Sequence, residues 1–363
     1  MIPAQLYSIV FLYIVVVLTI FVSLKLSGQT YNTIRHGDNN SVFALGLCMI
    51  LALWIGMRPS WWGFGDSVLY EHVFNLMKND IPDAYGESAE IVWNTITYYC
   101  SQTMDVSAYF TIISFGYFGF TYLACRIFTP NNVLVSVLFM LGAFSFYAYG
   151  TNGLRNGLAC SITLFIIAFM SCSNKNLPIA LIFVFLAINI HRTTLLPLTS
   201  LFASVYVIKS FKWAYIFWLL SILISLVAGG AMTTMFAGLG FDDRLSYLTD
   251  YDIGMFSHTG FRWDFLLYSM MPIVLGYYVV IKRGIQDRTY TILLNTYTLA
   301  NAFWVMVIRA NYSNRFAYLS WFMYPIVLAY PLLRLDVWGD MQGKRLKQIM
   351  LAHIGFTWFM ATF

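Results

Sequence analysis

The chain has 363 residues, of which 60% are hydrophobic and only 10% are charged. A soluble domain usually carries about 25% charged residues, so this composition excludes a water-soluble globule. The mean hydropathy is +0.69, and no polar block is long enough to form a separate soluble domain. We therefore predict an all-α integral membrane protein, with a single polytopic domain over 1–363.

Apolar runs in the sequence predict a bundle of about 11–13 transmembrane helices, because a spanning helix needs about 20 mainly apolar residues. In chain order the predicted segments are 5–24, 41–57, 105–125, 133–149, 154–171, 177–190, 193–208, 213–230, 263–281, 291–308, 316–333 and 347–363. The stretch 58–104 is predicted as an outer loop that could contain an interfacial helix over 89–104, and 231–262 as a second outer loop. The first run lacks a small-residue cleavage site, so we interpret it as a retained span.

The connections between these segments differ in charge. If alternate connections lie in the cytoplasm, they carry most of the 21 lysines and arginines and few of the 16 acids. This distribution satisfies the positive-inside rule, so we assign these connections to the cytoplasm and the remaining ones to the outer side. The basic residues left on the outer side are Arg58, Lys78, Arg155, Arg192, Arg244, Arg262, Arg309 and Arg315.

Arginine predominates among these outer bases, and several of the arginines lie at predicted helix ends. Arginine binds phosphate in a bidentate manner, so the pattern suggests a polyanionic ligand. Each arginine could instead reach lipid headgroups or pair with a loop carboxylate. The five cysteines have no C-x-x-C or His-rich spacing, which favours helix packing over metal or redox chemistry.

A second outward feature is His191-Arg192-Thr193-Thr194, which lies between two apolar runs. An unpaired charge in hydrocarbon costs several kcal/mol, so these side chains must face a polar cavity or a partner. His191 could serve as a base near neutral pH, or it could be a hydrogen-bonded packing residue.

The first part of the outer loop 58–104, from Arg58 to Glu71, contains several aromatic residues and two carboxylates. Trp61 and Trp62 could form part of an interfacial belt, or they could stack on sugar rings beside Asp66 and Glu71. Asp242, Asp243, Asp250 and Asp252 in the second outer loop could hold a divalent cation, although simple solvation is the preferred interpretation. The sequence has no phosphate-binding loop, H-E-x-x-H zinc motif or G-x-S-x-G nucleophile elbow.

Five short motifs occur in a characteristic order: Arg58 with Gly65-Asp66-Ser67-x-x-Tyr70, Leu154-Arg155-Asn156-Gly157-Leu158-Ala159, Asn189-Ile190-His191-Arg192-Thr193-Thr194-Leu195, Arg244-Leu245-Ser246-Tyr247, and Asn314-Arg315-Phe316. Together they resemble the signatures of EpsG-like, Wzy-type bacterial polysaccharide polymerases. The sequence departs from that pattern at Asn156, where glutamine is common, and at Arg192-Thr193, where a small residue and serine commonly follow the histidine.

The resemblance implies a GT-C-like glycosyltransferase of the bacterial inner membrane that works at the periplasmic face. Such an enzyme moves a growing glycan from undecaprenyl pyrophosphate onto the next lipid-linked oligosaccharide repeat unit, to build O-antigen, capsule or exopolysaccharide. The implied partners are the undecaprenyl-pyrophosphate-linked oligosaccharide, membrane lipids and a chain-length regulator protein. No nucleic acid, cofactor or metal is expected.

We assign roles to the outer residues on this basis. The predicted catalytic residues are His191 or Asp66 as the base and Arg155 as an electrostatic catalyst. The predicted pyrophosphate ligands are Arg155, Arg192 and Arg244, with Arg58, Arg262, Arg309 and Arg315 as lesser candidates. The predicted sugar contacts are Trp61, Trp62, Tyr70, Glu71 and Tyr247. The alternatives are a flippase for lipid-linked oligosaccharides, a membrane acyltransferase with His191 as its base, and a non-catalytic lipid-binding subunit.

Overall fold

The computed structural model describes most of the chain, and the described residues contain helices and no strands. The described ranges are 3–37, 40–81, 90–172, 176–237, 260–310 and 313–362. Contacts within the chain gather in two compact units. Unit 1 consists of Met1–His191 and Ala329–Phe363, and unit 2 consists of Arg192–Leu328.

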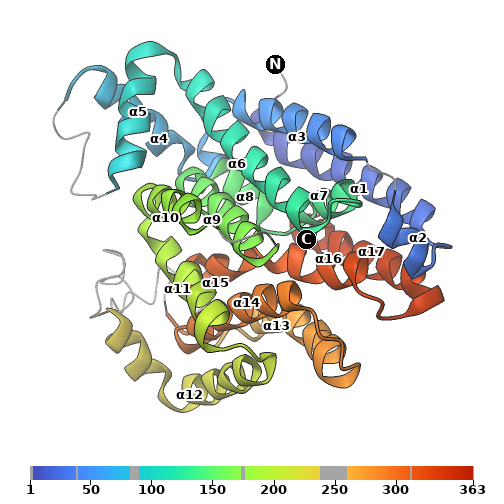
Figure 1. The fold of residues 1–363 in the computed structure, drawn as a ribbon. Coiled ribbons are helices and arrows are strands. Elements are labelled where there is room, and N and C mark those ends of the chain that lie inside the picture. The colour runs from blue at the N-terminus through green and yellow to red at the C-terminus, as the bar shows by residue number, and fades with distance from the viewer. Residues whose placement is uncertain are drawn as a thin grey trace. The chain divides into compact units, whose positions relative to one another are not determined.

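Unit 1 combines the N-terminal half of the chain with its C-terminal helix (Figure 1). Its elements are η1 (Ala4–Leu6), α1 (Tyr7–Leu26), α2 (Tyr31–His36), α3 (Ser41–Gly56), η2 (Trp62–Phe64), α4 (Ser67–Lys78), α5 (Ile91–Thr103), α6 (Val106–Phe128), α7 (Val133–Leu141), α8 (Phe146–Thr151), α9 (Leu154–Cys172), α10 (Leu177–Ile190), η8 (Gly339–Met341) and α17 (Gln342–Thr362).

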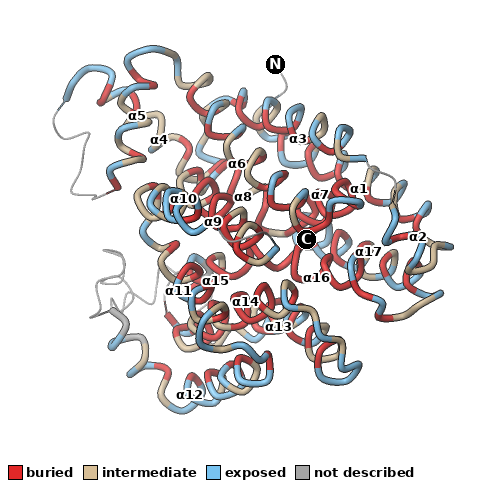
Figure 2. Tube along the Cα trace, in the orientation of Figure 1, coloured by how far each residue is buried: buried red, intermediate tan, exposed pale blue. Residues whose placement is uncertain are grey.

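Helix α6 is the centre of unit 1, because it packs against both α3 and α9. Its buried face includes Tyr109, Tyr117 and Phe118, which pack with other aromatic rings. Helix α10 packs against α9, and α17 lies along α1 although the two are at opposite ends of the sequence. Figure 2 shows the buried interior of the unit, with exposed strips on α1 and α3 that suit contact with lipid.

The segment 133–149 was predicted as one spanning helix, and this prediction is wrong. Helix α7 ends at Leu141, and α8 begins at Phe146. Side chains of α17 bind the backbone on either side of this break. The Thr357 hydroxyl donates to the carbonyl of Gly142, just after α7, at 2.7 Å, and His353 Nε2 donates to the carbonyl of Phe139, in the last turn of α7, at 2.9 Å. Irregular backbone at membrane depth requires such internal partners, which explains why the helix can break here.

Unit 2 is built around a buried central helix, α14. Its elements are η4 (Arg192–Thr194), α11 (Leu195–Phe202), η5 (Ala203–Val207), α12 (Phe211–Ala237), α13 (Trp263–Gly276), η7 (Tyr277–Lys282), α14 (Arg288–Met306), α15 (Ser313–Trp321) and the first part of α16 (Tyr324–Arg334).

Hydrogen bonds join α14 to its neighbours inside unit 2. The Asn301 side chain accepts from Trp218 Nε1 at 2.8 Å and donates to the Ser320 hydroxyl at 3.1 Å. The backbone of α12 leaves helical geometry at Ala228. The segment 193–208 is not one α-helix either, because 3₁₀, α and π turns follow one another there.

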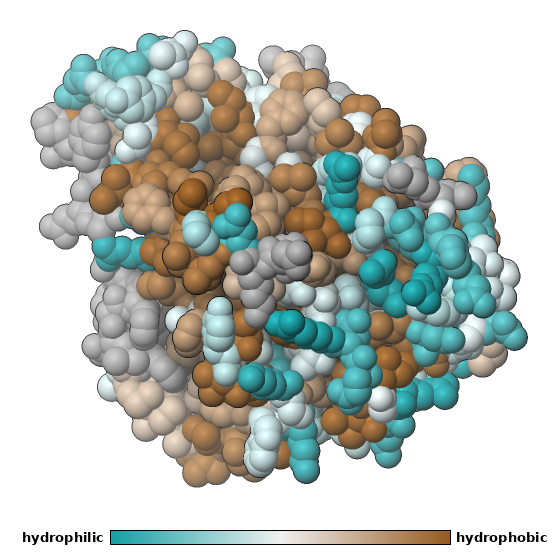
Figure 3. Space-filling model, viewed as in Figure 1, coloured by the Kyte–Doolittle hydropathy of each residue, from teal (hydrophilic) through white to brown (hydrophobic). Residues whose placement is uncertain are grey.

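Six helices in the described part of the chain are long and apolar enough to span a membrane. They are Ala4–Leu26, Val106–Phe128, Leu154–Cys172, Phe211–Met232, Trp263–Lys282 and Arg315–Arg334. Two shorter apolar helices, Ser41–Gly56 and Leu177–Ile190, also coincide with predicted segments. On the face shown in Figure 3, apolar side chains cover α6, α9 and α10, and hydrophilic ones gather around α2. The polytopic all-helical prediction is confirmed, whereas the GT-C-like architecture remains a prediction.

Candidate active site

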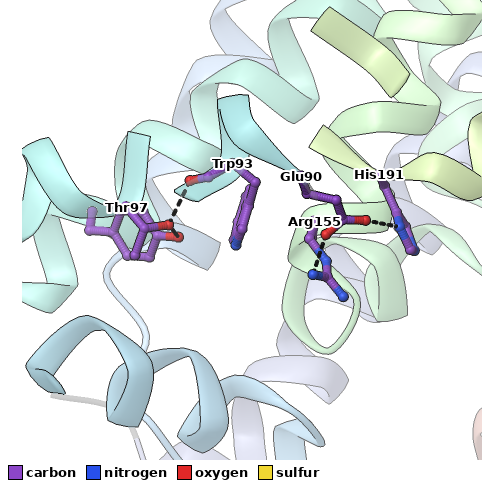
Figure 4. Close-up of polar contacts among 6 residues, drawn as sticks. Glu90, Trp93, Thr97, Arg155 and His191 are labelled. Atoms are coloured by element: carbon purple, nitrogen blue, oxygen red, sulfur yellow. Dashed lines mark hydrogen bonds and ion pairs between the residues drawn. The ribbon is translucent and has the colours of Figure 1, made fainter. Parts of the chain in front are cut away.

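Three ionisable side chains from separate helix ends meet in unit 1 (Figure 4). Glu90 directly precedes α5, Arg155 lies in the first turn of α9, and His191 directly follows α10. Because α10 packs against both α5 and α9, residues far apart in the sequence reach one place. We call Glu90, Arg155 and His191 the charged triad.

The Glu90 carboxylate is the bridge of the charged triad. Its Oε1 lies 2.8 Å from His191 Nδ1, and its Oε2 accepts a hydrogen bond from Arg155 Nη1. Glu90 is only 5% exposed, whereas the side chains of Arg155 and His191 keep 20% and 15% exposure. A buried carboxylate requires compensating partners, and here one cation and one imidazole supply them.

The geometry fixes how His191 holds its proton. An ionised carboxylate only accepts hydrogen bonds, so Nδ1 carries the N–H that donates to Glu90. In the neutral ring, Nε2 is then the basic nitrogen. A carboxylate that orients an imidazole in this way prepares it to take a proton from a hydroxyl.

Arg155 occupies an unusual position for a cation. The N-terminus of a helix carries partial positive charge, and an arginine in the first turn adds to it rather than offsetting it. Helix stability alone therefore does not favour Arg155, and Glu90 supplies part of the compensating charge. Together, the arginine and the amide groups at the start of α9 form a site suited to an anion.

Arg58 is buried beside the end of α8 rather than lying on the surface. It is 2% exposed, and it donates to the carbonyls of Ile55 at 2.9 Å and Thr151 at 2.8 Å. Its guanidinium also lies 4.9 Å from the centre of the Phe110 ring. Burial lowers the pKa of Arg58 to about 10, so the side chain stays charged at neutral pH. This placement indicates a positioning role rather than direct contact with a ligand.

A second contact holds the turn between α8 and α9, in which Asn152 lies. The backbone N–H of Asp66 donates to Asn152 Oδ1 at 2.8 Å. Gly65 has a φ of +64°, and a Cβ added to it would lie 2.3 Å from that same oxygen. The Arg58 and Asp66 segment thus holds Thr151 and Asn152, which lead directly into Arg155. The Asp66 side chain itself is partly exposed.

We expect Arg58→Ala to destabilise the protein. The change would remove the side-chain donor of the buried Thr151 carbonyl, weaken the hydrogen bonding of the Ile55 carbonyl and open a cavity beside the end of α8. We expect a cost of about 3 kcal/mol in the free energy of unfolding. Thermal unfolding of the purified protein in detergent measures this. Lys78→Ala, at an exposed lysine of α4, is the matched control and should melt like wild type. Equal melting of both variants would contradict the role given to Arg58.

Aromatic side chains line up beside the charged triad. Trp93, one turn after Glu90, contacts Tyr70 with ring centres 5.8 Å apart and Tyr109 at 6.1 Å. The Tyr109 hydroxyl lies 2.9 Å from Thr97 Oγ1. This arrangement places Tyr70, a predicted sugar contact, next to the helix that carries Glu90 at its start.

The other predicted sugar contacts differ in exposure. Trp62 is 71% exposed, whereas Trp61 packs edge-on against Phe64 at 5.3 Å. Glu71 is partly buried on α4. Tyr247 lies outside the described residues.

The remaining predicted phosphate ligands belong to unit 2. Arg262 pairs with Asp264 through contacts of 2.6 and 3.0 Å and stacks over Phe265. Arg309 lies over the Phe261 ring and beside Gly229, where an added Cβ would be 2.8 Å from its Cδ. Arg192 follows His191 in sequence, and Arg315 is exposed on α15. Arg244 lies outside the described residues.

Glu90 was not among the predicted site residues. Its sequence signal is weak, because it is a single acid at the start of the stretch 89–104, which could form an interfacial helix. The described residues hold no cluster of three metal-ligating side chains. The four aspartates that could hold a cation, at 242, 243, 250 and 252, lie outside the described residues.

The fold and the site together define a multi-pass helical membrane protein with a buried carboxylate that joins an imidazole to a guanidinium. The family model described as the EpsG family matches residues 42–356, and the chain belongs to this family. No curated protein and no solved structure matches the chain. Family membership makes it a polysaccharide polymerase in general terms, with lipid-linked oligosaccharide as its class of substrate.

Proposed function

We propose that the chain extends a polysaccharide at the periplasmic face of the bacterial inner membrane. The growing glycan is transferred from undecaprenyl pyrophosphate to a hydroxyl of the next lipid-linked repeat unit. The observation that carries this proposal is the Glu90 carboxylate, which holds a candidate base and a candidate anion ligand together. The reaction requires both groups, one for the acceptor and one for the leaving group.

In the proposed step, the acceptor hydroxyl oxygen attacks the anomeric carbon of the donor sugar. His191 Nε2 takes the hydroxyl proton, a new glycosidic C–O bond forms, and the bond from the anomeric carbon to the phosphate oxygen breaks. The bonding electrons leave with the lipid pyrophosphate. A single displacement of this kind inverts the anomeric configuration and needs no metal.

Each member of the charged triad has a distinct task in this step. Glu90 orients His191 and stabilises the imidazolium that forms. Arg155 offers its remaining N–H donors to the departing pyrophosphate, where charge develops in the transition state. His191 is preferred to Asp66 as the base because a buried carboxylate fixes its ring, whereas the Asp66 contact with Asn152 runs through its backbone.

Reconstitution tests this function directly. The purified chain in nanodiscs, given only a synthetic undecaprenyl-pyrophosphate-linked repeat unit, should produce a ladder of longer glycans and release undecaprenyl pyrophosphate. Transport of the substrate between leaflets without a ladder would identify a flippase and overturn the proposal. Acyl transfer from a thioester donor would do the same in favour of an acyltransferase.

His191→Ala should slow ladder formation by about 10²–10⁴-fold, the usual contribution of a general base. His72→Ala is a matched control, because His72 is an exposed histidine on α4. Normal rates for His191→Ala, with normal expression and folding, would remove His191 from the reaction.

A further inference from the structure

A cavity of about 750 Å³ lies at the other end of α1 from the Arg58 region. Tyr7 at the start of α1 contacts Trp54 near the end of α3, so the last turns of α1 lie beside the first turns of α3. The cavity is bordered by these two helix ends, by α2 and by the start of α7. Its volume falls within the range of about 300–1,000 Å³ that is typical of small-molecule sites.

The lining of this cavity has an apolar part and a polar part. Leu18, Phe21 and Val22 of α1 contribute the apolar part. The polar part includes Lys25, Gln29, Asn32 and His36, and no carboxylate is found among the described lining residues. Lys25 Nζ lies 4.4 Å from the centre of the Phe21 ring, at the boundary between the two parts. This charge pattern favours an anion attached to an apolar chain.

Specific contacts fix the polar wall in place. The Asn132 and Asn131 side chains donate to the carbonyls of Ile34 and Arg35 in α2, each at 2.8 Å. Gly37 ends α2 with a φ of +42°, and a Cβ added there would lie 2.3 Å from the Asn131 carbonyl oxygen. The turn after α2 therefore packs closely on the loop before α7, and the cavity has a defined wall.

We propose that this cavity binds one anionic phospholipid of the cytoplasmic leaflet. The lipid phosphate lies beside Lys25 and the neighbouring amide groups, and an acyl chain follows Leu18, Phe21 and Val22. The charge distribution of the sequence places this end of α1 in the cytoplasm, where anionic headgroups and basic pockets between spanning helices associate. This lipid site is separate from the charged triad.

Native mass spectrometry of the full chain in detergent tests the proposal, with phosphatidylglycerol as the probe and phosphatidylcholine as the neutral comparison. Wild type should retain one phosphatidylglycerol at least fivefold more strongly than phosphatidylcholine. Lys25→Gln should remove this preference. Val22→Trp, which fills the apolar part, should lower the binding of both lipids. Lys212→Gln, at an exposed lysine at the start of α12, should behave like wild type.

A phosphatidylglycerol with a photoreactive acyl chain gives the position of the bound lipid. We expect crosslinks to peptides that contain residues 18–26 or 132–135. Equal retention of the two lipids, unchanged retention in both cavity variants, or crosslinks only elsewhere would overturn the proposal. Competition by free glycerol phosphate at equal concentration would show a phosphate site rather than a lipid site, and would also overturn it. None of these measurements depends on polymerase activity.

Discussion

Glu90→Gln is expected to slow glycan extension by about 100-fold or more, with little change in expression. Glutamine keeps the size of the side chain, but its neutral amide cannot pair with Arg155 and stabilise a protonated His191 at the same time. Loss of a carboxylate that orients a catalytic imidazole has effects of this size or larger in other enzymes. The rate of ladder formation from the synthetic repeat unit measures the change.

The control for this change is Asp80→Asn, which alters an exposed acid of the same outer region. Asp80 has a φ of +52°, which asparagine also tolerates, so the control should fold and extend glycan normally. A rate for Glu90→Gln within a factor of three of wild type would show that the bridge between Arg155 and His191 is dispensable.

Arg155→Ala is expected to reduce the rate by about 10²–10³-fold, comparable with the loss of one well-placed donor to a developing negative charge. Arg155→Lys should recover only a small part of this loss. Lysine keeps the charge, but it cannot contact both Glu90 and a phosphate oxygen with a planar fork. Single-turnover rates at saturating lipid-linked substrate separate this effect from weaker binding.

Arg126→Ala is the matched control, since Arg126 is an exposed arginine in the last turn of α6 and lies outside the charged triad. It should give normal ladders. If Arg155→Lys were as active as wild type, a simple positive charge would suffice, and the role of the fork would be contradicted.

The helices could be predicted from hydropathy because each predicted segment contains a long apolar run. The prediction failed at 133–149, where the sequence is mainly apolar but the backbone breaks after Leu141. The partners that permit the break, His353 and Thr357, lie more than two hundred positions away. The local sequence pattern therefore cannot indicate that these distant partners are present.

The site was predicted in part for a similar reason. Arg155 stood out as one of the arginines on the outer side, and His191 stood out because it lies between two apolar runs, where a charged side chain needs a polar partner. Glu90 did not stand out, since an acid in an outer loop is ordinary until its partners are known. Arg58 has the same residue type as a phosphate ligand, but burial and two backbone carbonyls give it a positioning role. Residue type indicated the kind of chemistry, whereas the tertiary contacts show which of these side chains lie together.

The central claim is that Glu90 and His191 act as one unit in glycan transfer. A double-mutant cycle in the ladder assay tests it most directly, with rates for Glu90→Gln, His191→Ala and the two changes combined. Residues that work as a unit give strongly non-additive losses, so the double variant should be slower than His191→Ala by much less than the factor that Glu90→Gln causes alone. If the double variant were slower than His191→Ala by the same factor by which Glu90→Gln is slower than wild type, the two residues would act independently. That result would contradict the claim.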